Sequence, residues 1–317
     1  MSDHDLLLRR PETFLGLPAL PPDALRAHGA RVAVLGVPFD CGIHPFRVGA
    51  REGPAAVRHQ SRLIRRFHPL RGDQDVPALL GAADCGDVAI IPAQPAMALP
   101  KIEQAAGQIL DAGAVAIGIG GDGAVSLPLM RAAGRRHSGL VALHVDSHTD
   151  DYPAPPEDRY NPTTQFTCAA EEGAIDAQHS WHLGIRGFTF RQGVVSRSRG
   201  LGFRVVPIDE LLARGCAQTI AEFRQGAAGR PVYLCWDMDG FDPAGAPGVC
   251  TPAWGGLSAR EGIHLMRQLA GLRIVAMDFN TVSPAQDIDG MAAHLCAHMI
   301  AEAMLVLAST LGLIVGE

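Results

Sequence analysis

The sequence lacks the cysteine patterns of a disulfide-bonded or zinc-binding domain. Its seven cysteines are scattered over 317 residues, are odd in number and include no CxxC pair. Such cysteines are typical of reduced thiols, several of them simple core residues. The segment Met1 to Asp5 lacks a basic region before an apolar stretch, so we expect no signal peptide. These absences together predict a cytoplasmic location.

Long apolar runs and an excess of positive charge are also missing. The chain has no uninterrupted run of about 18 apolar residues, which argues against a membrane-spanning segment. Its net charge of -6 argues against a nucleic-acid-binding surface. What the chain does have is 47% hydrophobic residues, which is ample for a large buried core.

The order of the predicted elements favours one α/β domain. Residues 1–30 form a Pro-rich, weakly periodic arm, which we expect at the surface or at a subunit contact. Over residues 31–317, apolar runs of strand length alternate with helical patterns, which indicates a largely parallel sheet covered on both faces. Strands are predicted at 31–38, 84–92, 114–119, 139–143, 181–187, 203–208, 231–237 and 274–279, and helices from 53 and at 98–112, 126–134, 166–178, 209–225, 258–269 and 290–313.

Two acidic motifs follow two of these strands. Asp146, His148 and Asp150 are spaced by two, which places them on one face of an extended segment, and Asp237 and Asp239 repeat that spacing. Like charges at neighbouring strand ends are costly to bury without a counter-ion. The five side chains therefore predict a site for divalent cations, and their number suits two metals. Taken alone, the first motif would be better interpreted as a polar turn after a core strand.

Six motifs lie in colinear order: GVPFD (36–40), GAREGP (49–54), GGD (120–122), DSHTD (146–150), GIRG (184–187) and DMDGFDP (237–243). Together they make residues 31 to 310 resemble the ureohydrolases, which include arginase, agmatinase and the guanidino-acid hydrolases. The agmatinase-like members are the most similar. The resemblance implies an arginase-like three-layer α/β/α fold, trimers or hexamers, and a two-metal site, usually manganese and in some members nickel. It also implies hydrolysis of small guanidino compounds to urea and an amine.

The resemblance also implies a role for each acidic residue. Asp146 and Asp237 resemble the ligands that bridge both metals. His148 and Asp239 resemble the ligands of one metal, and Asp150 resembles a ligand of the other. Asp150 is in addition the candidate catalytic residue, which accepts a proton from the attacking water.

Three positions depart from the ureohydrolase pattern. Gly123 stands where a metal-binding histidine is expected, so the metal that also uses Asp150 loses its nitrogen donor. Asn161 lies where a proton-handling histidine is expected. Thr281 replaces a glutamate that binds the guanidinium, and neutral threonine cannot form that bidentate charge-assisted pair. We therefore assign Asn161 and Thr281 as altered substrate-binding positions and expect incomplete metal occupancy.

Other histidines could in principle replace the missing nitrogen donor. His144 shares a strand face with Asp146 but lies one pleat toward the core, where a satisfied core histidine is the simpler interpretation. His44 lies in a basic loop and could reach the site from the side. His294 and His298 lie one turn apart on the last helix, and without an evident third ligand they suit packing better than zinc.

Two hypotheses follow. In the first, this chain is the degenerate, weakly or non-catalytic subunit of a hetero-oligomer, paired with a complete paralogue. It then resembles a subunit of the metformin-cleaving hydrolases, within a complex that acts on a guanidine or biguanide. In the alternative, the chain is a self-sufficient amidinohydrolase with an altered metal and substrate site. Changes outside the metal ligands alone commonly cost about 10–100-fold in affinity or activity, so three departures favour the first hypothesis.

Overall fold

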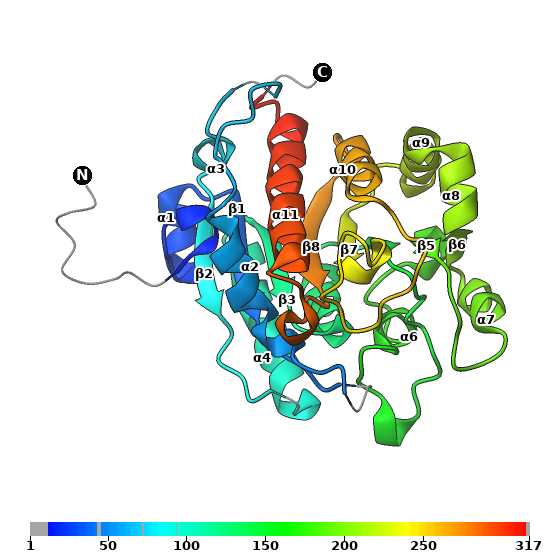
Figure 1. Cartoon of the computed structure of the whole chain (residues 1–317). Helices are drawn as coiled ribbons and strands as arrows, with labels where there is room; N and C mark the ends of the chain where they lie inside the picture. Colours follow the sequence, from blue (N-terminus) through cyan, green and yellow to red (C-terminus); the bar gives the residue numbers. More distant parts are fainter. Residues whose placement is uncertain (1–11, 43–45, 72, 93, 315–317) are drawn as a thin grey trace.

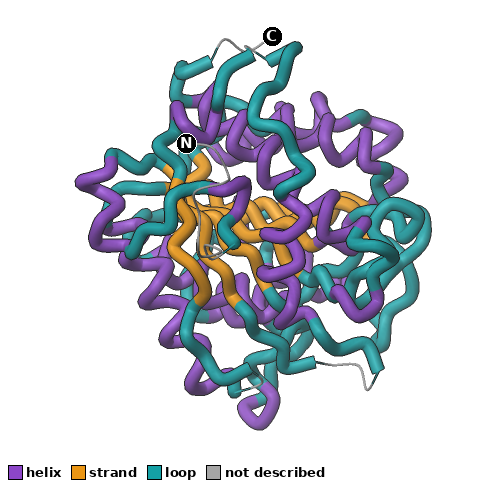
Figure 2. Tube along the Cα trace, turned by 60° about the vertical axis from the view of Figure 1, so that its left-hand side comes forward, coloured by secondary structure: helices purple, strands orange, loops and turns teal. Residues whose placement is uncertain are grey.

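A single parallel sheet forms the centre of the molecule. The computed structural model describes residues 12–42, 46–71, 73–92 and 94–314. The strand order is β2-β1-β3-β8-β7-β4-β5-β6, and every neighbouring pair is parallel. Figures 1 and 2 show this sheet between two layers of helices, which confirms the predicted α/β/α fold. The strands are β1 Val32–Val37, β2 Ala83–Asp87, β3 Val115–Gly120, β4 Val141–Val145, β5 Trp181–Ile185, β6 Arg204–Pro207, β7 Val232–Asp237 and β8 Ile274–Asn280.

The helices bury an apolar core on each face of the sheet. One core contains buried side chains of α2, α3, α8, α9, α10 and α11, and the other contains those of α1, α4, α5 and α6. The central strands β1, β3, β4, β7 and β8 are buried along nearly their whole length, as their continuous apolar runs predict. The helices are α1 Leu25–His28, α2 Gly53–Ser61, α3 Val76–Leu79, α4 Pro95–Asp111, α5 Ser126–Gly134, α6 Gln165–Glu171, α7 Val194–Leu201, α8 Ile208–Arg214, α9 Cys216–Ala227, α10 Ala259–Gln268 and α11 Met291–Thr310.

Local sequence explains where several helices begin and end. Ser258 caps α10 by accepting from the backbone N–H of Glu261, whose carboxylate accepts in return from the Ser258 N–H. The helix predicted at 209–225 is instead two helices, because Gly215 adopts a φ of 82° between α8 and α9. The helix predicted at 166–178 is shorter and ends at Glu171, and α7 had no counterpart in the prediction.

The longest apolar helix packs inside the molecule. Among the described residues, α11 is the one helix long and apolar enough to cross a membrane by length and composition. Of its most apolar window, 67% is buried within the molecule. Its apolar sequence is interrupted by His294, His298 and Glu302, so the helix contains no uninterrupted apolar run of membrane-spanning length.

The N-terminal segment contributes to the core. Phe14, Leu15, Leu17 and Leu25 are all buried. The backbone N–H of Phe14 donates to Asp84 Oδ2 at 2.8 Å, which fixes this segment beside β2. The part of residues 1–30 that the structure describes therefore packs against the domain.

Candidate metal centre

The acidic motifs meet where the central strands end. Asp146 follows β4 and Asp237 ends β7, and these two strands are neighbours in the sheet. Their loops lie on the side of the sheet toward which the arrowheads of β2 and β8 point in Figure 1. A pocket opens there, in the position at which parallel sheets bind ligands. Its lining includes His148, Asp150, Asp237 and Asp239.

Three of the predicted ligands form one compact group. His148 Nδ1 lies 3.4 Å from Asp146 Oδ1 and 3.2 Å from Asp239 Oδ2. Ser147 orients the second carboxylate, since its hydroxyl donates to Asp239 Oδ1 at 2.7 Å. The ligand atoms of Asp146, His148 and Asp239 all lie within 4.8 Å of one another, so one cation could contact all three.

The electrostatics of the pocket favour a cation. Burial first, and then the Asp239 carboxylate, raise the pKa of Asp146 to about 7. Burial and neighbouring carboxylates also raise the pKa values of Asp150 and Asp237 well above their usual range. The pKa of Asp239 is lowered instead, because the nearby His148 imidazolium outweighs the effect of burial. Carboxylates held this close in a buried site fit a divalent ion, which would neutralise their charge.

A second group surrounds Asp146 from the core side. The ligand atoms of His144, Asp146 and Asp150 also lie within 4.8 Å of one another. His144 is fully buried, as predicted, with Nδ1 2.8 Å from His182 Nδ1 and Nε2 2.7 Å from Asp146 Oδ2. His144 Nε2 and Asp146 Oδ2 are both buried without a hydrogen-bond partner of good geometry among the described residues.

Gly123 leaves room that another residue fills. A Cβ atom built there would lie 2.8 Å from Gln165 Nε2 and 3.4 Å from Asp150 Oδ2. Gln165 Nε2 donates to Asp150 Oδ2 at 2.6 Å. No local spacing in the sequence indicates Gln165, because its position relative to Gly123 depends on tertiary packing.

The two predicted substrate positions differ in their placement. Thr281 lines the pocket and its hydroxyl donates a short hydrogen bond to Asp237 Oδ1. Its φ of 66° is strained for a β-branched residue, as is common at functional sites. Asn161 is absent from the lining: its Oδ1 accepts from Thr163, and its Nδ2 donates to the Asp158 carbonyl oxygen. The prediction that Asn161 contacts substrate is therefore not supported by its geometry, because its amide is hydrogen-bonded within its own loop.

Several further residues fix the loops around the pocket. Asp122 Oδ2 accepts from the Cys41 N–H at 2.8 Å, and Asp40 Oδ2 accepts from the Gly49 N–H at 2.6 Å. Arg186 donates to backbone carbonyl oxygens, including that of Asp239 at 2.7 Å, which fixes the backbone beside the site. The remaining histidine alternatives lie elsewhere: His44 falls outside the described residues, while His298 lies 3.6 Å from Glu302 on α11, in a different pocket.

Comparison with known proteins agrees with this geometry. The family model described as "Arginase family" matches residues 30–306. The chain belongs to the arginase family. It is 36% identical to a guanidinopropionase of Pseudomonas aeruginosa over 304 residues, covering 94% of this chain and 92% of the relative. It is 33% identical to a mitochondrial agmatinase of Gallus gallus over 286 residues, covering 90% and 84%. The solved structure of proclavaminate amidinohydrolase from Streptomyces clavuligerus superimposes with a TM-score of 0.88, at 34% identity, covering 95% of this chain and 98% of that one.

Membership of the arginase family confirms the resemblance predicted from the sequence. It makes this chain a relative of hydrolases that act on C–N bonds of amidine compounds, with agmatinase-like homologues. The prediction that this chain binds metal agrees with the two groups of Asp and His side chains described above, both of which include Asp146. The more specific similarity to a hetero-oligomeric metformin hydrolase stays a prediction.

Proposed function

We propose that this arginase-family chain is a metal-dependent amidinohydrolase, which cleaves a C–N bond of a small guanidine-type cation to release urea and an amine. The observation that carries the proposal is the group of Asp146, His148 and Asp239 at the pocket. The named activities of its relatives support the same reaction class. This proposal corresponds to the alternative hypothesis above, in which an altered site still works.

The charge of the pocket lining supports a cationic substrate. Five carboxylates line it, and the one arginine in the lining, Arg47, already donates to backbone carbonyl oxygens. Arg47 Nη2 lies 2.5 Å from the Val249 oxygen and Nε lies 3.0 Å from the Cys250 oxygen. Because this guanidinium is engaged, it favours a substrate without a carboxylate group. The five carboxylates are those of Asp40, Asp122, Asp150, Asp237 and Asp239.

The apolar part of the lining supports a substrate with a hydrophobic substituent. Tyr152, Phe188 and Phe190 contribute aromatic side chains to the pocket. A guanidinium or biguanide cation has a flat face that stacks on such rings, and cation–π attraction adds to that contact. We therefore propose an alkyl-substituted guanidine or biguanide as the substrate class.

The proposed roles follow from position. Divalent cations, when bound, supply a nucleophilic water near neutral pH and Lewis acidity. Asp146, His148, Asp150, Asp237 and Asp239 would hold them, with manganese or nickel as candidates. Asp150 also lines the pocket, and we propose that its carboxylate accepts a proton during the reaction. Asp40 and Asp122 line the pocket and are not among the proposed metal ligands, so their carboxylates would attract the guanidinium.

The test is urea release by the purified chain loaded with Mn²⁺ or Ni²⁺. The substrates would be agmatine, guanidinobutyrate, guanidine and metformin. We expect urea from a member without a carboxylate, and no urea from the Asp239→Asn variant, because that change removes a carboxylate that contacts His148. Water that displaces dimethylamine from metformin leaves guanylurea, so that product is measured for the biguanide. Absence of urea from every guanidine and of guanylurea from metformin, at saturating metal, would contradict the proposal.

A second candidate function is the partner subunit of a hetero-oligomer. One observation favours it: exposed aromatic residues beside the pocket, where Phe188 is 104% exposed, Trp254 76% and Phe190 75%. Exposed apolar groups of this kind are typical of protein contact surfaces. A complete paralogue covering them would form a trimer or hexamer with this chain, which would then have little or no turnover of its own.

A further inference from the structure

The space beside Gly123 is filled by a carboxamide. Gln165 is 1% exposed, and its Nε2 atom lies 2.8 Å from the Cβ that a side chain at position 123 would have. The same amide reaches Asp150, which the family resemblance assigns to the metal that lost its histidine. A polar group therefore occupies the place of the missing ligand.

The direction of this side chain is fixed by its neighbours. The Thr164 hydroxyl donates to the Arg159 carbonyl oxygen at 2.7 Å, and Thr164 is 1% exposed. On the other side, the Phe166 N–H donates to the Asp150 carbonyl oxygen at 3.1 Å. The fully buried Phe166 ring stacks on His144 with a centroid distance of 4.2 Å. Residue 165 is thereby held facing Asp150.

One end of the Gln165 amide has no partner. Nε2 donates to Asp150, but Oε1 is buried and makes no hydrogen bond with any described residue. A buried amide oxygen without a partner is unfavourable. A half-turn about the last side-chain bond exchanges Oε1 and Nε2, which brings the oxygen toward Asp150 Oδ2. Two oxygens so close repel each other unless a cation contacts both, and both are ligands that hard cations prefer.

Two further atoms that could bind a metal lie close to Asp150. Asp146 Oδ2 and His144 Nε2 are buried and lie 2.7 Å from each other, neither makes a hydrogen bond of good geometry with a described residue, and both belong to the group that includes Asp150. We propose that Gln165 Oε1 is a ligand of the second divalent cation and replaces the histidine expected at Gly123. This inference rests on the proposed function, because it places a second cation in the same site. An oxygen-rich ligand set there would favour Mn²⁺ over softer ions.

The experiment is a titration of the metal-free chain with Mn²⁺ alone. Calorimetry measures the number of ions and their affinities, and electron paramagnetic resonance detects pairs of coupled ions. We expect two ions in the native chain, the first bound more tightly than the second. Gln165→Met keeps the length of the side chain and removes its oxygen, so the second ion should bind at least about tenfold more weakly. Gln165→Glu should bind it more tightly. The first ion should be unchanged in both variants.

Gln218→Met is the matched control, because Gln218 is an exposed residue of α9. It should bind both ions as the native chain does. The proposal is overturned if the native chain takes a single ion at millimolar Mn²⁺, if Gln165→Met weakens both ions equally, or if neither Gln165 variant changes the second. Since no substrate is present, failure of urea release with intact two-ion binding would count against the proposed function and leave this inference standing.

Discussion

Two glycines of one loop are there for different reasons. A Cβ at Gly121 would lie 1.6 Å from the carbonyl oxygen of Phe39, so the backbone itself requires glycine. At Gly123 the nearest atom is the end of the Gln165 side chain, and no positive φ restricts the position. The tightest contact of a side chain at 123 is therefore with a group that can move, while the Pro162 carbonyl oxygen, 3.2 Å from such a Cβ, would have to give by a few tenths of an ångström.

That difference leads to a prediction for Gly123→His. The imidazole should displace the Gln165 amide and bind the second ion, raising its affinity by about 10-fold or more. Urea release should not rise, because Thr281 still lacks the charge to pair with a guanidinium. Mn²⁺ titration and a urea assay measure both effects. Gly123→Ala is the control, since its methyl group offers no donor, and a large gain in turnover by the histidine variant would contradict the prediction.

The residues of the site were predictable only where the chain is locally regular. The spacing of Asp146 and His148 after a strand, and of Asp237 and Asp239 after another, indicated their convergence. The hydrogen bond from Gln165 to Asp150 and the one from Thr281 to Asp237 each join residues that are well separated in sequence, so no local pattern indicates them. Asn161 was assigned from the family pattern, but hydrogen bonds within its own loop decide its orientation.

At the scale of elements, strands were easier to predict than helices. The strands of a fully covered parallel sheet bury both faces, so their sequences are short continuous apolar runs. The helices α8 and α9 share one continuous helical pattern, and the single residue Gly215 separates them. In α6, only the five residues from Gln165 to Ala169 are buried, so the pattern there carried little information about where the helix ends.

Strand β8 contains a buried carboxylate with a measurable pH effect. Asp278 is fully buried and accepts hydrogen bonds from Tyr233, Asn280 and Ser126. Burial outweighs these bonds and raises its pKa from 3.8 to about 6. A raised pKa means that the folded state binds the proton more tightly, so this contribution to stability is complete below pH 3.8 and is lost as the pH rises through 6.

We therefore predict that Asp278→Asn changes how stability depends on pH. As the pH rises from 4 to 7, the native chain should lose up to roughly 3 kcal/mol of unfolding free energy relative to the variant. Chemical denaturation at several pH values measures this shift. Asp209→Asn, at an exposed position of α8, controls for the loss of one negative charge. A constant difference across the pH range would contradict the prediction.

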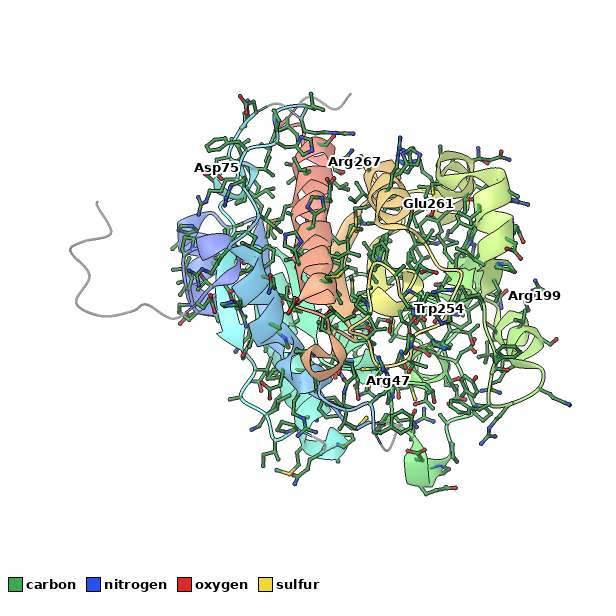
Figure 3. The ribbon with its side chains drawn as sticks, in the orientation of Figure 1. Arg47, Asp75, Arg199, Trp254, Glu261 and Arg267 are labelled. Carbon is green, nitrogen blue, oxygen red and sulfur yellow. The ribbon has the colours of Figure 1, made fainter. Side chains whose placement is uncertain are left out.

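At the scale of the whole molecule, the pocket and an exposed apolar surface lie side by side. Phe188 and Phe190 line the pocket and are also strongly exposed. Trp254 belongs to the loop before α10 and is labelled, with Arg47, in Figure 3. The two loops meet, because a Cβ at Gly187 would lie 3.3 Å from the Ala253 side chain. A surface this close to the pocket could be covered by substrate or by a partner subunit.

The two candidate functions predict opposite results for one variant of a mixed assembly. Asp237 ends β7 and belongs to the proposed metal site, so Asp237→Ala removes a ligand from this chain alone. If the chain is a self-sufficient amidinohydrolase, the purified native chain releases urea at about 1 per second or more, and the variant does not. If it is a partner subunit, the chain alone is inactive and co-purifies in fixed ratio with a co-expressed paralogue. Asp237→Ala then leaves most of the activity, whereas the same change in the paralogue abolishes it. We expect the first result, because the donors around Asp146 remain grouped in this chain, and retention of activity by the variant assembly would establish the second.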